Sequence, residues 1–136
     1  MAAETVEFEL VSPEKLLLSE AVAMVVVPGE DGDFGVLPRH APLISNVRPG
    51  VISVYAERSQ VSQRIFVAGG FAEITGERCT VLAETAMPLE EIDRQATEQR
   101  LRDAREDLAD AKDDFAKDTA KRQIALNEAM LQALKS

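Results

Sequence analysis

The chain has 136 residues, 46% hydrophobic and 29% charged, values typical of one globular domain or of a small domain with an appendage. Its formal net charge of −9 argues against nucleic acid and anionic membrane surfaces as partners, because both would repel it. No apolar run reaches the roughly 20 residues of a membrane-spanning helix, so we expect no direct membrane insertion. The first ten residues lack the basic segment and apolar core of a signal peptide, so we expect none.

Two strand patterns open the chain. Residues 5–10 alternate between apolar and charged side chains, which predicts a strand with one exposed face. Residues 21–27 are apolar at every position, with Val25 and Val27 on one face of the expected strand. Because a strand with two apolar faces needs cover on both, we expect the C-terminal tail or another protein to cover its outer face.

A glycine-rich acidic loop follows at residues 29–33. Glu30, Asp31 and Asp33 stand among its glycines, a composition typical of a tight, solvent-exposed turn. The loop lacks the spaced oxygen ligands and the terminal glutamate of an EF-hand, so calcium binding is not expected.

Prolines delimit two short predicted strands, at residues 34–37 and 43–47. His40 lies at the corner between them. It is the only histidine, and no cysteine stands near it in the sequence, so it does not predict a metal site. The simplest interpretation is a corner histidine hydrogen-bonded to backbone.

Four further strands are predicted, at residues 51–55, 63–68, 71–75 and 79–83. A glycine pair at residues 69–70 predicts a bulge or a sharp corner between the second and the third. Many short strands with turns at this spacing favour a β-sandwich or a β-barrel. Cys79 is the only cysteine, so the chain cannot form an internal disulfide, which fits a reducing compartment. We expect this cysteine to be buried and unreactive.

The composition changes at residue 87, beyond which good helix formers dominate. Apolar residues recur at spacings of three and four, and we expect two antiparallel helices with a break near residues 112–114, where an aspartate could cap the second helix. No glycine marks the break, so one long bent helix is the alternative. The apolar stripe is rich in alanine and buries little area, which predicts a weakly held arm that can detach and extend.

No motif for catalysis is present: there is no nucleophile elbow, no Walker sequence and no cysteine with a plausible histidine partner. We therefore expect neither an enzyme nor a cofactor. Two other classes are disfavoured. A ligand-binding sandwich needs converging polar groups that the sequence does not offer, and a helical-arm chaperone needs apolar arm tips, whereas residues 112–122 are mostly charged.

Four segments resemble the epsilon subunit of rotary F-type ATP synthases: GVLPRHAPL at 35–43, RPGV at 48–51, GGF at 69–71 and VLAETA at 81–86. The resemblance covers the whole chain. It implies an all-β N-terminal β-sandwich over residues 1–86, followed by a C-terminal α-helical hairpin over residues 87–136.

The resemblance also implies a function: a non-catalytic central-stalk subunit that couples c-ring and gamma rotation to ATP synthesis. Such a subunit is peripheral at the cytoplasmic face of the bacterial inner membrane. The c-ring loops are then expected to contact the acidic residues Glu30, Asp31 and Asp33. The expected contacts with the gamma subunit are His40, Val25 and Val27.

For the tail, the resemblance implies extension into the catalytic head, where basic residues meet acidic segments of the alpha/beta subunits and stop ATP hydrolysis. The expected contacts are Lys117, Lys121 and Arg122. Interspersed aspartates dilute this positive charge, which predicts weak inhibition.

Some members of the family bind ATP through the motif Ile/Leu-Asp-x-x-Arg-Ala. Here Ile92 and Asp93 keep its first two positions, but Ala96 stands where the arginine belongs. Arg94 and Arg100 are the nearest substitutes, and both are displaced along the helix. We therefore predict weak or absent ATP binding.

Overall fold

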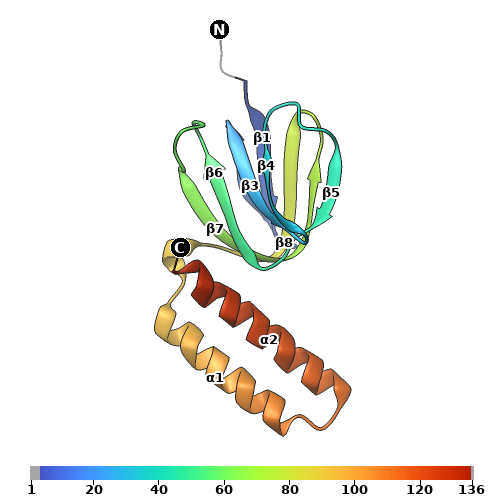
Figure 1. The fold of residues 1–136 in the computed structure, drawn as a ribbon, viewed down its shortest axis with the longest axis vertical. Coiled ribbons are helices and arrows are strands. Elements are labelled where there is room, and N and C mark those ends of the chain that lie inside the picture. Colours follow the sequence, from blue (N-terminus) through green and yellow to red (C-terminus); the bar gives the residue numbers. More distant parts are fainter. Residues whose placement is uncertain (1–3, 136) are drawn as a thin grey trace. The chain divides into compact units, whose positions relative to one another are not determined.

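The computed structural model describes residues 4–135. It divides into two compact units, and the boundary in the sequence lies between Pro88 and Leu89. The first unit is built of strands and the second of helices (Figure 1). The predicted fold class, a β-sandwich followed by a helical hairpin, is confirmed. No helix among residues 4–135 is long and apolar enough to cross a membrane.

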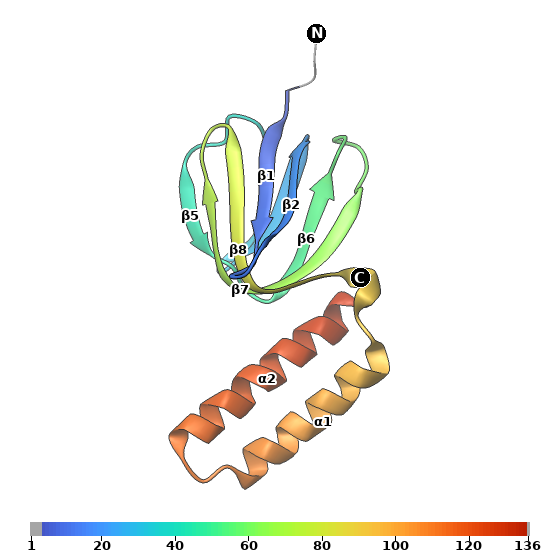
Figure 2. The ribbon, with the colours of Figure 1, turned by 180° about the vertical axis from the view of Figure 1, so that it is seen from behind.

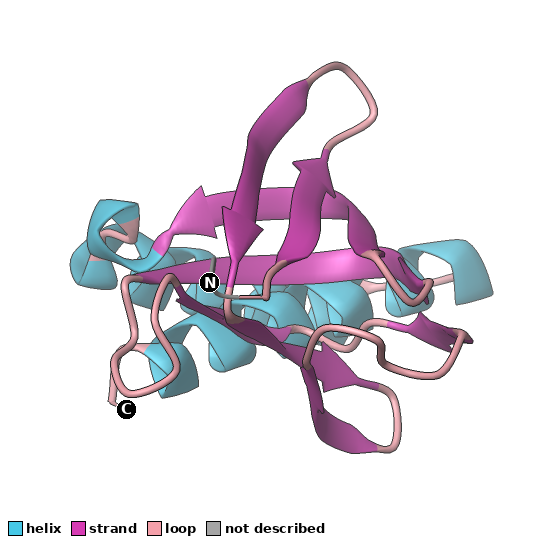
Figure 3. Ribbon diagram, turned by 90° about the horizontal axis from the view of Figure 1, so that it is seen from above, coloured by secondary structure: helices cyan, strands magenta, loops and turns pink. Residues whose placement is uncertain are grey.

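Residues 4–88 of the first unit form eight strands, and their hydrogen bonds connect them in the order β2-β1-β8-β7-β6-β3-β4, with β5 added to β7. Two layers result, since the first half of β7 pairs with β6 and its second half pairs with β5. The layers face each other across the core in Figures 1 and 3. The bounds are β1 Val6–Val11, β2 Leu16–Val22, β3 Met24–Gly29, β4 Gly32–Val36, β5 Leu43–Asn46, β6 Gly50–Tyr55, β7 Gln63–Ile74 and β8 Arg78–Pro88.

Strand β7 is continuous, although the sequence predicts two strands separated by the glycine pair. Gly69 and Gly70 have φ angles of +73° and +100°, which bend the strand. The pairing with β8 keeps one register on both sides, from Ala68 opposite Thr85 to Gly70 opposite Ala83. Of the two predicted alternatives, the structure therefore has the sharp corner and not the bulge. The corner lets one strand serve both layers.

The apolar run at residues 21–27 is not one strand. β2 ends at Val22 and β3 begins at Met24, while the amide of Ala23 donates to the carbonyl of Tyr55 over 2.8 Å. The chain passes from one layer to the other at this point, so Val25 and Val27 both point into the core and have no exposed surface. The double apolar pattern comes from this change of layer. The inference of an outer face that needs cover was wrong for this strand.

Strands β1 and β8 pair in parallel, a contact that the hairpin pattern of the sequence does not predict. Figure 2 shows β1 between β8 and β2. Cys79 lies opposite Phe8 in this pair, and both side chains are completely buried. Burial raises the pKa of the Cys79 thiol to about 12, so the thiolate is absent at neutral pH. The expected buried thiol is confirmed.

The second unit holds the short 3-10 helix η1 (Leu89–Glu91) and the helices α1 (Arg94–Asp110) and α2 (Asp114–Ala133). Asp93 caps α1 by accepting from the amide of Ala96 at 3.0 Å, and Asp113 caps α2 by accepting from the amide of Ala116 at 2.7 Å. The two-helix alternative with an aspartate cap is therefore confirmed, and the long bent helix is excluded.

Candidate functional site

A line of apolar side chains crosses the outer face of the β2-β1-β8-β7 layer. The strand registers place Leu16 opposite Val11, Val11 opposite Leu82, and Leu82 opposite Phe71. Directly paired residues project from the same face of a sheet, so Val11, Leu82 and Phe71 form one line. Leu16 extends the line onto β2 just past a register shift in the β1–β2 pair, between Leu10 and Val11, and we call these four residues the apolar row. Leu16 is 56% exposed and Phe71 is 41% exposed.

The apolar surface continues onto the edge strand β5. Asn46 pairs with Phe71, and Ile44, two residues earlier, lies on the same face opposite Glu73. The Ile44 side chain is 71% exposed. A row of exposed apolar side chains of this kind marks an interaction surface, whereas single exposed residues do not.

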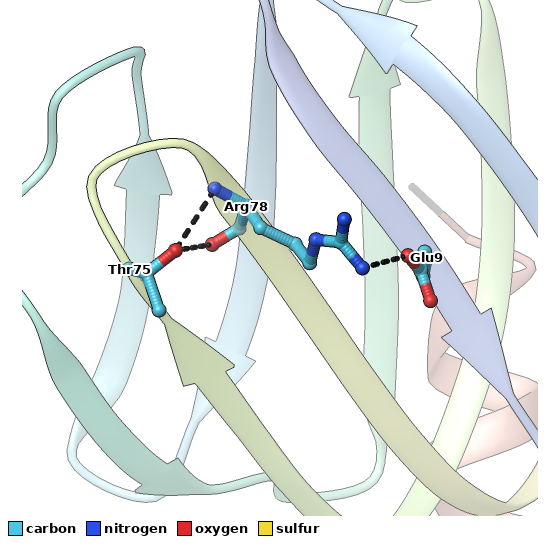
Figure 4. Close-up of polar contacts among 3 residues, drawn as sticks. All are labelled: Glu9, Thr75 and Arg78. Carbon is cyan, nitrogen blue, oxygen red and sulfur yellow. Dashed lines mark hydrogen bonds and ion pairs between the residues drawn. The ribbon is translucent and has the colours of Figure 1, made fainter.

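Charged side chains border the apolar row. Arg78 reaches from β8 toward β1 and donates to the carboxylate of Glu9 over 2.6 Å (Figure 4). Thr75 closes the preceding turn, since its hydroxyl accepts from the amide of Arg78 at 3.1 Å. An apolar centre with a polar, solvent-accessible rim is the usual anatomy of a protein–protein interface.

The acidic loop is a tight β3–β4 turn with Glu30 and Asp31 at its centre, because Gly29 pairs with Gly32. Arg48 fastens the loop by donating to the carbonyl of Gly29 at 2.6 Å and by pairing with the carboxylate of Asp33.

The three acids of this loop are not equivalent. Asn46 donates to the carboxylate of Glu30 at 3.1 Å, and Arg48 engages Asp33. Asp31 has no such partner among residues 4–135 and remains exposed. It lines a shallow hollow of about 300 Å³ together with Phe34 and Leu43. The loop therefore presents one free carboxylate beside an apolar floor, which suits the stem and the charge of a basic side chain.

His40 is half-buried, and its Nδ1 lies 2.6 Å from the carbonyl oxygen of Ala41. Nδ1 therefore carries the proton, as the simple interpretation of a backbone-bonded histidine predicts. The preceding residue, Arg39, has a φ of +66°, and its amide donates to the carbonyl of Gly76 at 2.7 Å. This bond holds the corner beside the β7–β8 turn.

The three nucleotide candidates do not converge. The Asp93 carboxylate caps α1, and Arg94 is exposed at the start of the same helix. Arg100 donates to Thr97 and to Asn127. Within the described part of the chain, no group of three His, Cys, Asp or Glu side chains is placed to hold a metal ion.

The basic tail residues Lys117, Lys121 and Arg122 are exposed on α2. Among residues 4–135, none of the three forms an ion pair or a side-chain hydrogen bond. They are therefore available to a partner.

Sequence reasoning missed the apolar row and the role of Arg48. The row depends on the parallel β1–β8 pair, which joins residues 11 and 82 across the sheet. Leucine or phenylalanine on the polar face of an alternating strand was the only available signal. Arg48 lies 15 residues from Asp33, and only the fold brings the two together.

Two solved structures share this fold. A chain of the Euglena gracilis mitochondrial ATP synthase, from a structure of OSCP, F1 and c-ring, matches with a TM-score of 0.83 at 24% identity, covering 97% of this chain and 82% of that one. A chain of the central stalk/c-ring of the Tetrahymena thermophila mitochondrial ATP synthase matches with a TM-score of 0.71 at 14% identity, covering 98% and 99%. At such identities the likeness concerns the fold.

Sequence comparison is more specific. Residues 5–89 match the family described as ATP synthase, Delta/Epsilon chain, beta-sandwich domain. The ATP synthase epsilon chain of Rhodospirillum rubrum is 57% identical over 133 residues, covering 98% of each chain, and that of Rhodospirillum centenum is 54% identical over 138 residues, covering 98% of this chain and 94% of the relative. The sandwich, the two-helix unit and these matches along almost the whole sequence agree: the chain belongs to the epsilon chain family of ATP synthase.

Proposed function

We propose that this chain is a central-stalk subunit of a proton-translocating ATP synthase and couples rotation of the c-ring and gamma to ATP synthesis. Its role is mechanical and not catalytic, and it sits peripherally at the cytoplasmic face of the bacterial inner membrane as part of the complex. The observation that carries the proposal is the exposed apolar row on the sandwich of an epsilon-family chain. A rotor subunit must transmit torque without slipping, and a broad apolar contact with a polar rim can provide such a grip.

The apolar row is the proposed contact with gamma. The sequence-based prediction of Val25 and Val27 as gamma contacts is wrong, because both side chains are fully buried and cannot reach a partner. His40 remains a candidate at the corner beside the β7–β8 turn. Co-purification tests the function: a tagged chain should retain gamma and the c-ring in high salt, because added salt screens charge contacts but not apolar ones. Loss of gamma at every salt concentration would refute it.

Asp31 is the proposed contact with a basic side chain of the c-ring loops. We expect Asp31→Asn to weaken capture of the c-ring by the purified chain–gamma complex about threefold at low salt, the size of one exposed ion pair, with no difference in high salt. Glu57→Gln removes another exposed acid, from the β6–β7 loop, and serves as the control. Equal capture of the c-ring by the two variants would contradict the proposed contact between Asp31 and the c-ring.

The helical unit is proposed to inhibit ATP hydrolysis weakly when it extends toward the alpha/beta subunits. Lys117, Lys121 and Arg122 are the proposed contacts, and their lack of internal partners among residues 4–135 supports this role. ATP is proposed to bind weakly or not at all, since Arg100 is already engaged within the helical unit.

Removing residues 89–136 tests the inhibition. The cut falls after Pro88, because that residue still pairs with Ile65 in the sandwich. We expect the reconstituted enzyme to hydrolyse ATP at most a few-fold faster, and the charge-neutralised variant Lys117→Gln/Lys121→Gln/Arg122→Gln to reproduce that rise. An unchanged rate in both would eliminate the inhibitory role and leave the stalk role intact.

A further inference from the structure

Two polar residues are buried in the part of the chain that the structure describes, and both belong to the helical unit. Thr97 on α1 has no exposed surface, and Asn127 on α2 is 1% exposed. Burying a polar side chain costs free energy unless all of its hydrogen bonds are made. The burial of Thr97 and Asn127 therefore calls for hydrogen-bond partners that offset this cost.

Arg100 connects the two buried residues. Its Nη2 donates to the Thr97 hydroxyl at 3.1 Å, and its Nε donates to the Oδ1 of Asn127 at 3.3 Å. The Thr97 hydroxyl donates in turn to the carbonyl of Asp93 at 2.7 Å, and the Nδ2 of Asn127 donates to the carbonyl of Gln123 at 2.8 Å. No buried side-chain nitrogen or oxygen among residues 4–135 lacks a partner.

The rest of the contact between the helices specifies their alignment poorly. Of the five apolar side chains that are buried on the described residues of α1 and α2, Ala104, Ala120 and Ala133 are alanines, and one alanine can replace another if a helix slides; the other two are Leu101 and Met130. A second polar contact between the helices joins Arg105 to Glu128 over 3.7 Å, with both side chains more than half exposed, and such a pair contributes little. A slide of one turn would separate Asn127 from Arg100 and leave a buried amide oxygen without a donor.

We infer that Thr97, Arg100 and Asn127 form a register lock. This polar layer makes the observed alignment of α1 and α2 far more stable than alignments in which one helix is shifted along the other. A buried asparagine that fixes alignment at a cost in stability is well known from helical coils. The lock explains how a seam rich in alanine can hold one defined hairpin and still separate more readily than an all-apolar seam. The inference concerns the hairpin alone and does not depend on the proposed function.

Asn127→Leu in the full-length chain tests the lock. Leucine adds apolar area and leaves no buried group unpaired, because the exposed Arg100 can turn to water. Spin labels on Asp107→Cys and Lys121→Cys, both exposed, report the alignment, and Cys79 is too buried to take the label. We expect the single narrow distance distribution of the parent to widen or split, while amide exchange of the helices stays as slow or becomes slower. Ala125→Leu, exposed on α2, is the matched control and should change neither.

Arg100→Met provides a second, independent test at an exposed position. It leaves the buried Asn127 oxygen without its donor, so amide exchange in α1 and α2 should accelerate roughly tenfold. Adding Asn127→Leu to this variant should restore slow exchange but not the narrow distance distribution. A narrow distribution in Asn127→Leu, or unchanged exchange in Arg100→Met, would overturn the inference.

Discussion

Gly70→Ala should destabilise the sandwich by about 3 kcal/mol, because alanine is strained at positive φ and its methyl group has no room. A Cβ at this position would lie 1.8 Å from the carbonyl oxygen of Leu82 in β8. This clash can be relieved only if β7 and β8 separate at the corner where β7 passes between the layers. Urea unfolding followed by the fluorescence of Tyr55, the only tyrosine and a residue of β6, measures the loss.

Gly76→Ala is the matched control for this experiment. Gly76 precedes β8, and a Cβ there would meet no atom within 4 Å. Its φ lies outside the region that L-residues avoid, so alanine should leave the unfolding midpoint almost unchanged. Equal midpoints for the two variants would contradict the role of Gly70 as the corner of the sandwich.

Phe71→Glu should weaken binding of the chain to gamma by about a hundredfold or more. The substitution removes an aromatic anchor from the apolar row and places a charge that binding would strip of water. Phe71 is 41% exposed in the isolated chain, so the sandwich itself should keep most of its stability. Surface-immobilised gamma, with the purified full-length chain as analyte, gives the affinity.

Phe115→Glu makes the same chemical change at a site that is 77% exposed in the helical unit and serves as the control. It should bind gamma as the parent does. If Phe71→Glu also binds normally while its unfolding curve is unchanged, the apolar row is not the gamma contact. The search for that contact would then move to other faces of the sandwich.

Local patterns in the sequence predicted most of the elements. Alternation identified β1, and prolines delimited β4 and β5 to within a residue or two. The helical break was predicted at the aspartates, and Asp113 caps α2 there. These predictions hold because turn residues, caps and period-two alternation act through neighbours in the chain. The start of α1 was missed by a few residues, since the chain first continues β8 to Pro88 and then forms η1.

The candidate site was harder to predict from the sequence than the strands and helices. The acidic loop was visible as a cluster, but no local pattern distinguishes the free Asp31 from the engaged Glu30 and Asp33. That distinction depends on Arg48 and Asn46, which the bridge between Gly29 and Val47 places beside the loop. Val25 and Val27 were misassigned because a change of layer at Ala23 and a strand with two covered faces produce the same apolar run.

Sequence alone determined that this protein is a strand-rich body with a helical tail, acidic, without a recognisable catalytic motif and related to the epsilon chain. The tertiary structure decided which apolar side chains are buried and which remain outside. The reason is that burial depends on pairings between distant strands: Val11 and Leu82 become neighbours only through the parallel β1–β8 pair. The apolar row, the single free acid of the loop and the register lock all arise from such long-range contacts, and no local pattern encodes them.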